Sequence, residues 1–263
     1  MLNIGKGIQK QKVHVFLKGR RMLAKGNRAD LGIWILGLSL TAAAALPYSL
    51  GLVYSKSPST ISAMTGVGLI GLLAYALWVI GEKIRIQDGL GIGLVIIGTS
   101  LLAYSGAGDD HPARHFANIS LAVTVGVMLV VAAGGCILAW RSRKLHGVTF
   151  GLSAGLCIGV AIFLADAGLV RSGGSLSGLL DTPYPLLALA FAVAAVISTQ
   201  LGFLRGRALE VVPAVNAATI LTPMVLEIVV YGVCPSVFKL VLIAVILAGV
   251  FLLSGGTLSK VGA

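Results

Sequence analysis

Charged residues are scarce in this chain of 263 residues. Asp, Glu, Lys and Arg together make up 11% of the sequence, whereas a soluble domain carries about 25%. Hydrophobic residues account for 57%, and the mean hydropathy is +0.98. A water-soluble fold of this length cannot bury so much apolar surface, so lipid must be the solvent over most of the chain. Composition therefore predicts an all-α membrane protein.

The sequence also lacks the motifs of common enzyme classes. It has no HExxH zinc motif, no Walker A loop and no nucleophile elbow. Its three cysteines, Cys136, Cys157 and Cys234, show no metal-ligand spacing, which favours packed thiols. We therefore expect no enzymatic activity and no cofactor, and the sequence assigns no metal site. Without an ATP-binding element, energy for any work must come from an ion gradient, a partner or the gradient of a solute.

Eight apolar stretches are long enough to cross a bilayer, because a membrane helix needs about 20 residues. They cover residues 31–54, 61–80, 89–108, 119–140, 148–170, 185–204, 211–234 and 237–254. A basic segment over residues 1–30 precedes them, and a short tail over 256–263 follows.

The distribution of basic residues predicts the topology. Sixteen of the 20 Lys and Arg residues fall on one side of the eight predicted spans. The positive-inside rule then places both the N-terminal segment and the C-terminal tail in the cytoplasm. We expect a multi-pass protein of the inner (cell) membrane. The net charge of +11 is accounted for by topology, so no nucleic-acid partner is predicted.

The chain contains an internal repeat. A shift of 151 residues places residues 48–106 on residues 199–257 without a gap. The glycines that coincide under this shift are Gly51 with Gly202, Gly81 with Gly232, and Gly98 with Gly249. Corresponding spans are five spans apart, and an odd step puts the two copies in opposite orientations across the membrane. The sequence therefore predicts two inverted-topology repeats.

The first repeat is expected over residues 31–108, with three spans, and the second over residues 119–255, with five. The first repeat is thus expected to lack at least one N-terminal helix. Inverted repeats are typical of transporters that work by alternating access, with the solute site at the repeat interface near the midplane. An old duplication that serves stability alone is the alternative.

Several short stretches resemble a known family. One runs from Ala45-Leu46-Pro47-Tyr48 to Ser62-Ala63, and another is Gly81-Glu82-Lys83-Ile84, followed by a glycine-rich span from Gly89 to Gly98. This pattern is similar to the EamA-like drug/metabolite transporter superfamily, in which each half ends this way. The chain most resembles the branch with the NIPA-type magnesium transporters and their bacterial relatives. There, a half repeat begins with a helix ending in a basic stretch like residues 3–10.

Secondary transport of a small metabolite or drug-like solute is the function that these features predict. The family branch and the intramembrane acids favour a divalent cation such as magnesium as the alternative. A non-transporting membrane component, or a truncated transporter, is a third interpretation, because the first repeat is expected to lack a helix. The expected partners are a small-molecule or cation substrate and membrane lipid, and a homodimer is one assembly to consider.

The seventh predicted span carries the main candidate site. Asn216, Thr219, Pro223 and Glu227 are spaced by three, four and four residues, which places them on one helix face. A carboxylate within a span costs about 2.5–3.5 kcal/mol, so it faces the bundle interior or water. Pro223 also frees the carbonyl group of Thr219. Such a stripe can bind a cation or a polar solute, or its Glu can simply hydrogen-bond a neighbouring helix.

Three more residues complete the candidate substrate-binding set. Asp166 lies at a depth similar to that of Glu227, so two acids can form an outer cation vestibule; the alternative is a pair between Asp166 and Arg171. Tyr48 and Gln200 lie in corresponding parts of the two repeats and can line the pathway, or serve only as interhelical hydrogen bonds. The full candidate set is Asn216, Thr219, Glu227, Tyr48, Gln200 and Asp166.

A separate series of glycines predicts packing rather than chemistry. Gly151, Gly155 and Gly159 are spaced by four residues, so they share one face of the fifth predicted span. Small residues at this spacing let two helix backbones approach closely in a membrane.

Overall fold

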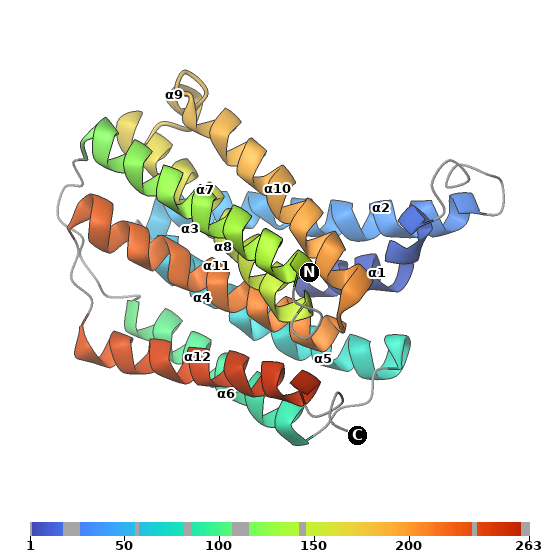
Figure 1. Cartoon of the computed structure of the whole chain (residues 1–263). Helices are drawn as coiled ribbons and strands as arrows, with labels where there is room; N and C mark the ends of the chain where they lie inside the picture. The colour runs from blue at the N-terminus through green and yellow to red at the C-terminus, as the bar shows by residue number, and fades with distance from the viewer. Residues whose placement is uncertain are drawn as a thin grey trace.

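The computed structural model describes residues 2–17, 27–55, 58–81, 86–106, 116–141, 146–232 and 236–258. In this part the chain is almost entirely helical and contains no strand, as an all-α protein requires. Figure 1 shows the helices stacked side by side in one bundle. Cys234, the Gly-Glu pair at residue 82 and most of the predicted tail lie outside the described residues.

Among the described residues, six helices are long and apolar enough to cross a membrane, as in a multi-pass membrane protein. They are α2 (Arg28–Ala43) continued by α3 (Ala45–Ser55), α6 (Ile86–Gly106), α7 (Asn118–Arg141), α8 (His146–Arg171), α10 (Tyr184–Arg205) and α11 (Ala208–Tyr231). A short helix, α9 (Leu176–Leu179), lies between α8 and α10. The last helix, α12 (Val237–Leu258), holds a shorter apolar helix over Val237–Leu252.

The second predicted span is broken into four pieces. It consists of α4 (Pro58–Met64), the 3₁₀ turn η3 (Thr65–Gly68), α5 (Leu69–Tyr75) and the π-helical turn η4 (Ala76–Ile80). Glycine is a poor helix former, and two glycines lie within η3, at positions 66 and 68. The second predicted span is thus not a continuous helix, and its break exposes the carbonyl group of Thr65 to side chains. Eight spans stay a prediction, because six helices meet the criteria of length and apolar character among the described residues.

The tightest packing lies between α8 and α11. A β-carbon added at Gly151 would lie 2.7 Å from the carbonyl oxygen of Val211, and one at Gly159 would lie 2.5 Å from Thr222. A β-carbon at Gly155 would collide with the carbonyl oxygen of Val215. The close packing predicted for this glycine series is therefore confirmed.

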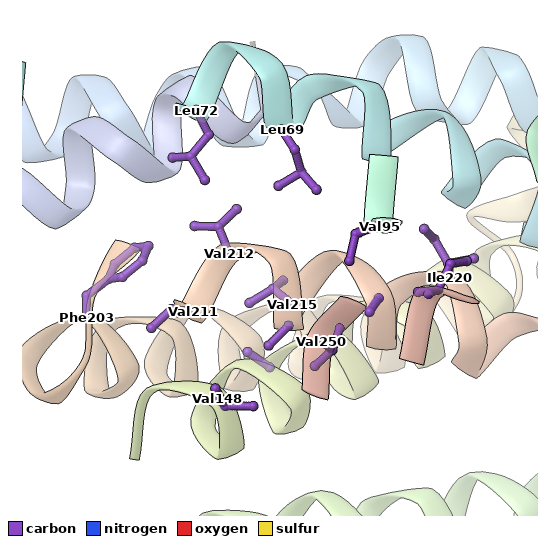
Figure 2. Packing of buried hydrophobic residues seen from close by; sticks show 14 of the residues in the cluster. Leu69, Leu72, Val95, Val148, Phe203, Val211, Val212, Val215, Ile220 and Val250 are labelled. Atoms are coloured by element: carbon purple, nitrogen blue, oxygen red, sulfur yellow. The ribbon is translucent and has the colours of Figure 1, made fainter. Parts of the chain in front are cut away.

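The apolar core extends from α11 to the elements on its other side. Figure 2 shows Leu69 and Leu72 of α5 facing Val212 and Val215 of α11, and all four belong to one buried cluster. Helices α6 and α12 contribute residues to the same cluster and lie side by side. In Figure 1, α6 runs from right to left and α12 from left to right. The two helices are thus antiparallel.

The N-terminal part of the basic segment is helical and buried. Helix α1 (Leu2–Lys12) packs against α2 and α5, whereas the sequence predicts a basic cytoplasmic segment over residues 1–30. A β-carbon at Gly5 would lie 2.7 Å from the carbonyl oxygen of Gly37, and one at Gly7 would lie 2.7 Å from the ring of Tyr75. Small residues let α1 approach its neighbours, and so its polar side chains enter the bundle.

Candidate functional site

Polar side chains gather in two places inside the bundle. We call the first the Lys6 cluster, and it consists of Asn3, Lys6, Gln9, Gln200 and Asn216. We call the second the Glu227 cluster, and it consists of Tyr48, Ser59, Ser62, Asp166, Glu227 and Tyr231. Each cluster joins elements of the first predicted repeat to elements of the second.

The break in the second predicted span is the centre of the Lys6 cluster. The carbonyl oxygen of Thr65, in η3, accepts hydrogen bonds from the side-chain amides of Asn3 (3.0 Å) and Asn216 (3.4 Å). Lys6 Nζ donates to Asn216 Oδ1 at 3.3 Å. Because a straight α-helix uses its carbonyl groups internally, the turn at η3 is what lets three elements meet at this point.

A pair of glutamines ties α1 to α10 and α2. Gln200 Nε2 donates to Gln9 Oε1 at 2.5 Å, and Gln200 Oε1 accepts from Trp34 Nε1 at 3.1 Å. Gln9 Nε2 in turn donates to Thr41 Oγ1 at 2.9 Å. These bonds engage both ends of the Gln200 amide between helices, which is the interhelical role considered as its alternative.

Lys10 fixes the end of α1 to the end of α10. Its Nζ atom donates to the carbonyl oxygens of Phe203 (2.5 Å) and Gly206 (2.7 Å). The last carbonyl groups of a helix lack helical partners and carry partial negative charge, so a lysine there is favourable. Lys12, the next basic residue of α1, forms an ion pair with Asp30 at 2.6 Å.

Glu227 lies in the bundle and contacts the first predicted repeat. Its two carboxylate oxygens accept from the backbone N–H of Ser59 (3.2 Å) and from Ser59 Oγ (2.6 Å). The side chain is buried, so the prediction that Glu227 does not face lipid is confirmed. Hydrogen bonds to an ionised carboxylate are about twice as strong as neutral ones, which makes this contact a firm link between α11 and α4.

Tyr48 and Asp166 lie in the same region as Glu227. The hydroxyl group of Tyr48 is 2.5 Å from Ser62 Oγ and interacts electrostatically with the carboxylates of both Glu227 and Asp166. Asp166 is buried and accepts a hydrogen bond from the hydroxyl group of Tyr231 at 2.9 Å. Two buried acids and several hydroxyl groups thus lie in one region of the bundle, and the acidic vestibule stays a prediction.

The six candidate residues do not form one site. Asn216 and Gln200 belong to the Lys6 cluster, whereas Tyr48, Asp166 and Glu227 belong to the Glu227 cluster. Thr219 belongs to neither, because its hydroxyl group lies 3.4 Å from the carbonyl oxygen of Gly155 on α8. Asn216 and Glu227 are 11 residues apart on α11, or about 16 Å along the helix axis.

Sequence reasoning missed three residues of the Lys6 cluster. Asn3, Lys6 and Gln9 are spaced by three residues, so they share a helix face, and all three are buried. The spacing was visible in the sequence, together with Gly5 and Gly7, which allow close packing. Assigning the whole basic stretch to the cytoplasm concealed it.

The described residues contain no group of three or more His, Cys, Asp or Glu side chains that could hold a metal ion. The chain matches no family model, no curated protein and no solved structure. The chemistry of the two clusters and the arrangement of the helices therefore carry the functional argument.

Proposed function

We propose that this chain is a secondary transporter of the drug/metabolite transporter type, which moves a small metabolite or drug-like solute across the inner membrane by alternating access. The basic stretch that follows α1 and the C-terminal tail are placed on the cytoplasmic side, as the positive-inside rule predicts. The observation that carries the proposal is that corresponding residues of the two predicted repeats meet, both where α6 packs on α12 and at the polar junction of Thr65 with Asn216. Inverted repeats with a polar interface supply the two interconvertible states that alternating access needs.

The packing of α6 on α12 supports an inverted repeat. A β-carbon at Gly98 would lie 2.7 Å from Ile246, and one at Gly249 would lie 2.8 Å from Val95. Under the shift of 151 residues, Gly98 corresponds to Gly249 and Val95 corresponds to Ile246, so the two contacts are equivalent. Equivalent reciprocal contacts are the pattern of a two-fold axis. Along this contact, residue numbers increase in α6 in the direction in which they decrease in α12, so the two helices are antiparallel. An axis along the membrane normal would leave corresponding helices parallel, so the antiparallel contact favours an axis in the membrane plane.

The same relation holds at the centre of the Lys6 cluster. Asn216 corresponds to Thr65 under the shift, and the two are hydrogen-bonded to each other at 3.4 Å. Gly81 and Gly232 also correspond, and both end their helices in the left-handed conformation, with φ of 73° and 70°. A residue that touches its own counterpart lies beside the two-fold axis. This contact supports a polar junction at the interface of the two proposed repeats.

Helix α1 extends the correspondence. It packs against α2 and α5, as α8 packs against α10 and α11. Both contacts depend on glycines, such as Gly5 in α1 and Gly155 in α8, that let backbones approach closely. This favours α1 as the part of the first repeat that corresponds to α8.

A divalent cation such as magnesium is the second candidate substrate. The Glu227 cluster favours it, because carboxylate and hydroxyl oxygens are the ligands that hard cations prefer. The two substrates make different predictions about the acid. A cation bound there requires the charge of Glu227, whereas a solute bound elsewhere requires it only if the acid carries a coupled proton or ion.

Uptake into proteoliposomes tests the proposal. The purified chain is reconstituted, and a panel of small solutes and divalent cations is offered to the wild type, to Glu227→Gln and to Glu210→Gln. Glu210 is the matched control, because it is a buried acid on the same helix that pairs with Arg207 at 3.6 Å. We expect uptake of at least one compound, abolished coupling in Glu227→Gln and retained coupling in Glu210→Gln, since the amide keeps the shape of the acid but not its charge.

Two results would count against the proposal in different ways. Absence of uptake for every solute and cation by the well-folded wild type would contradict transport. Unchanged uptake in a well-folded Glu227→Gln protein would remove Glu227 from the mechanism and leave transport supported by the repeat alone.

A further inference from the structure

Lys6 Nζ is a buried amine with few partners. The side chain is 3% exposed, and an ammonium group has three N–H donors. Its only hydrogen bond to the described part of the chain goes to Asn216 Oδ1, a neutral amide oxygen 3.3 Å away. The ion pairs of the described residues involve Lys12 and Arg207, not Lys6. When it is protonated, Lys6 therefore has two further N–H donors from which a ligand can accept.

A buried acceptor lies on the same face of α1. Asn3 Oδ1 is buried and has no hydrogen-bond partner within the described ranges, because the other side of this amide donates to Thr65. Asn3 is one helical turn before Lys6, so the two side chains project from the same face. Both lie at the junction that Thr65 and Asn216 form. The junction thus offers a positive donor and a neutral acceptor side by side.

This combination determines the charge of a suitable ligand. Charged side chains inside a membrane protein are costly and are normally paired with an opposite charge. Lys6 is in none of the ion pairs between described residues, so its charge, when present, is not compensated within the junction. A divalent cation would be repelled at this point. A carboxylate or phosphate group would neutralise Lys6 and accept its available N–H donors.

We infer that the solute bound at this junction is a small organic anion. Its carboxylate or phosphate group accepts from Lys6 Nζ, and a hydroxyl or amino group of the same molecule donates to Asn3 Oδ1. The inference rests on the proposed function, because it identifies the junction between the repeats as the solute site. It deepens that function by naming the charge and the hydrogen-bonding groups of the substrate.

Thermal melting of the full chain in detergent tests the inference with matched pairs of probes. Glycolate is compared with its neutral counterpart glycolamide, and glycerol 3-phosphate with glycerol, at equal ionic strength; ethanolamine and Mg²⁺ are the cationic probes. We expect the two anions, at several times their Kd, to raise the Tm by about 2–4 °C. The neutral and cationic probes should leave the Tm unchanged, because they cannot neutralise Lys6.

Two variants locate the effect. Lys6→Met keeps the length of the side chain and should lose the anion-dependent rise in Tm. Lys12→Met removes a lysine of the same helix whose charge is already paired with Asp30, and it should keep the rise. Because the wild type compares glycolate with glycolamide directly, the test stands even if Lys6→Met folds poorly.

Several outcomes would overturn the inference: equal stabilisation by charged and neutral probes, stabilisation by Mg²⁺ or ethanolamine alone, no stabilisation by either anion, or an undiminished rise in Lys6→Met. The uptake assay separates this inference from the proposed function. Uptake of a neutral or cationic solute without anion binding would overturn the anion site and support transport. Anion binding without uptake of any compound would support the anion site and contradict transport.

Discussion

Helix α11 has two different faces. One packs on α8 through Gly151, Gly155 and Gly159, so close that a β-carbon added at any of the three would clash with α11. The other carries Asn216 and Glu227 toward α1, η3 and α4, where hydrogen bonds accompany the apolar contacts. The glycine face lies within the second predicted repeat, and the polar face lies between the repeats. The difference suggests a rigid unit on one side and a junction suited to rearrangement and binding on the other.

The largest expected effect comes from breaking the glycine face. Gly155→Ala would place a methyl group against the carbonyl oxygen of Val215 and 2.7 Å from Ala218 Cβ. Backbone cannot move aside as a side chain can, so we expect a loss of about 3 kcal/mol in the free energy of unfolding. The measurement is thermal or chemical unfolding in detergent.

Gly126→Ala on α7 is the control, because a β-carbon there would meet no atom within 4 Å. This variant should melt at the wild-type temperature or slightly above it, since alanine is the better helix former. Equal melting of Gly155→Ala and the wild type would show that the α8–α11 contact is looser than described, and the contrast between the two faces would fail.

An intermediate effect is expected at the Glu227 end of the polar face. Ser59→Ala removes the 2.6 Å hydrogen bond to the carboxylate and leaves the backbone N–H bond in place. Hydrogen bonds to charged groups contribute about 1.5–3 kcal/mol, so we expect the free energy of unfolding to fall by an amount near the lower end of that range.

Ser198→Ala is the control, because Ser198 is a buried serine whose hydroxyl group lies 3.5 Å from Cys136 Sγ, and its replacement should cost less. A double-mutant cycle of Ser59→Ala with Glu227→Gln measures the coupling, and zero coupling would contradict the contact.

The smallest effect on stability is expected at Lys6. Replacing a buried, poorly compensated charge by an apolar side chain of similar length is often neutral or stabilising, so Lys6→Met should melt at or above the wild-type Tm. Unfolding of the ligand-free protein measures this. A marked drop in Tm would mean that Lys6 stabilises the bundle. The polar face would then serve stability, as the glycine face does, rather than binding.

Much of the fold follows from the sequence where apolar runs are long. The predicted spans 119–140, 148–170 and 185–204 coincide within a few residues with α7, α8 and α10. The break at η3 was not predicted, because hydropathy reports the apolar character of a segment and not its helical continuity. The burial of α1 was also not predicted, because basic residues ordinarily mark cytoplasmic loops. In this structure Lys10 instead binds carbonyl groups at the end of α10, and Lys6 lies inside the bundle.

The candidate site was predictable in part. The position of Glu227 inside the bundle follows from the cost of placing a carboxylate in lipid. The separation of Gln200 from Tyr48 depends on how the helices lie against each other, which no single helix encodes. Thr219 shares the spacing of the stripe, yet its hydroxyl group lies 3.4 Å from the carbonyl oxygen of Gly155 on α8. The spacing groups side chains along one side of a helix but does not determine which neighbouring helix each of them contacts.

The relation between the two repeats is the central claim, and single-cysteine labelling tests it most directly. Ile86 and Val237 begin α6 and α12, correspond under the shift of 151 residues, and are both strongly exposed. Each is replaced by cysteine in a chain without Cys136, Cys157 and Cys234, and a membrane-impermeant reagent is added to intact cells and to inverted vesicles. Inverted repeats predict that the two positions are labelled from opposite sides of the membrane. Labelling of both from the same side would contradict the inverted arrangement and, with it, the main support for alternating access.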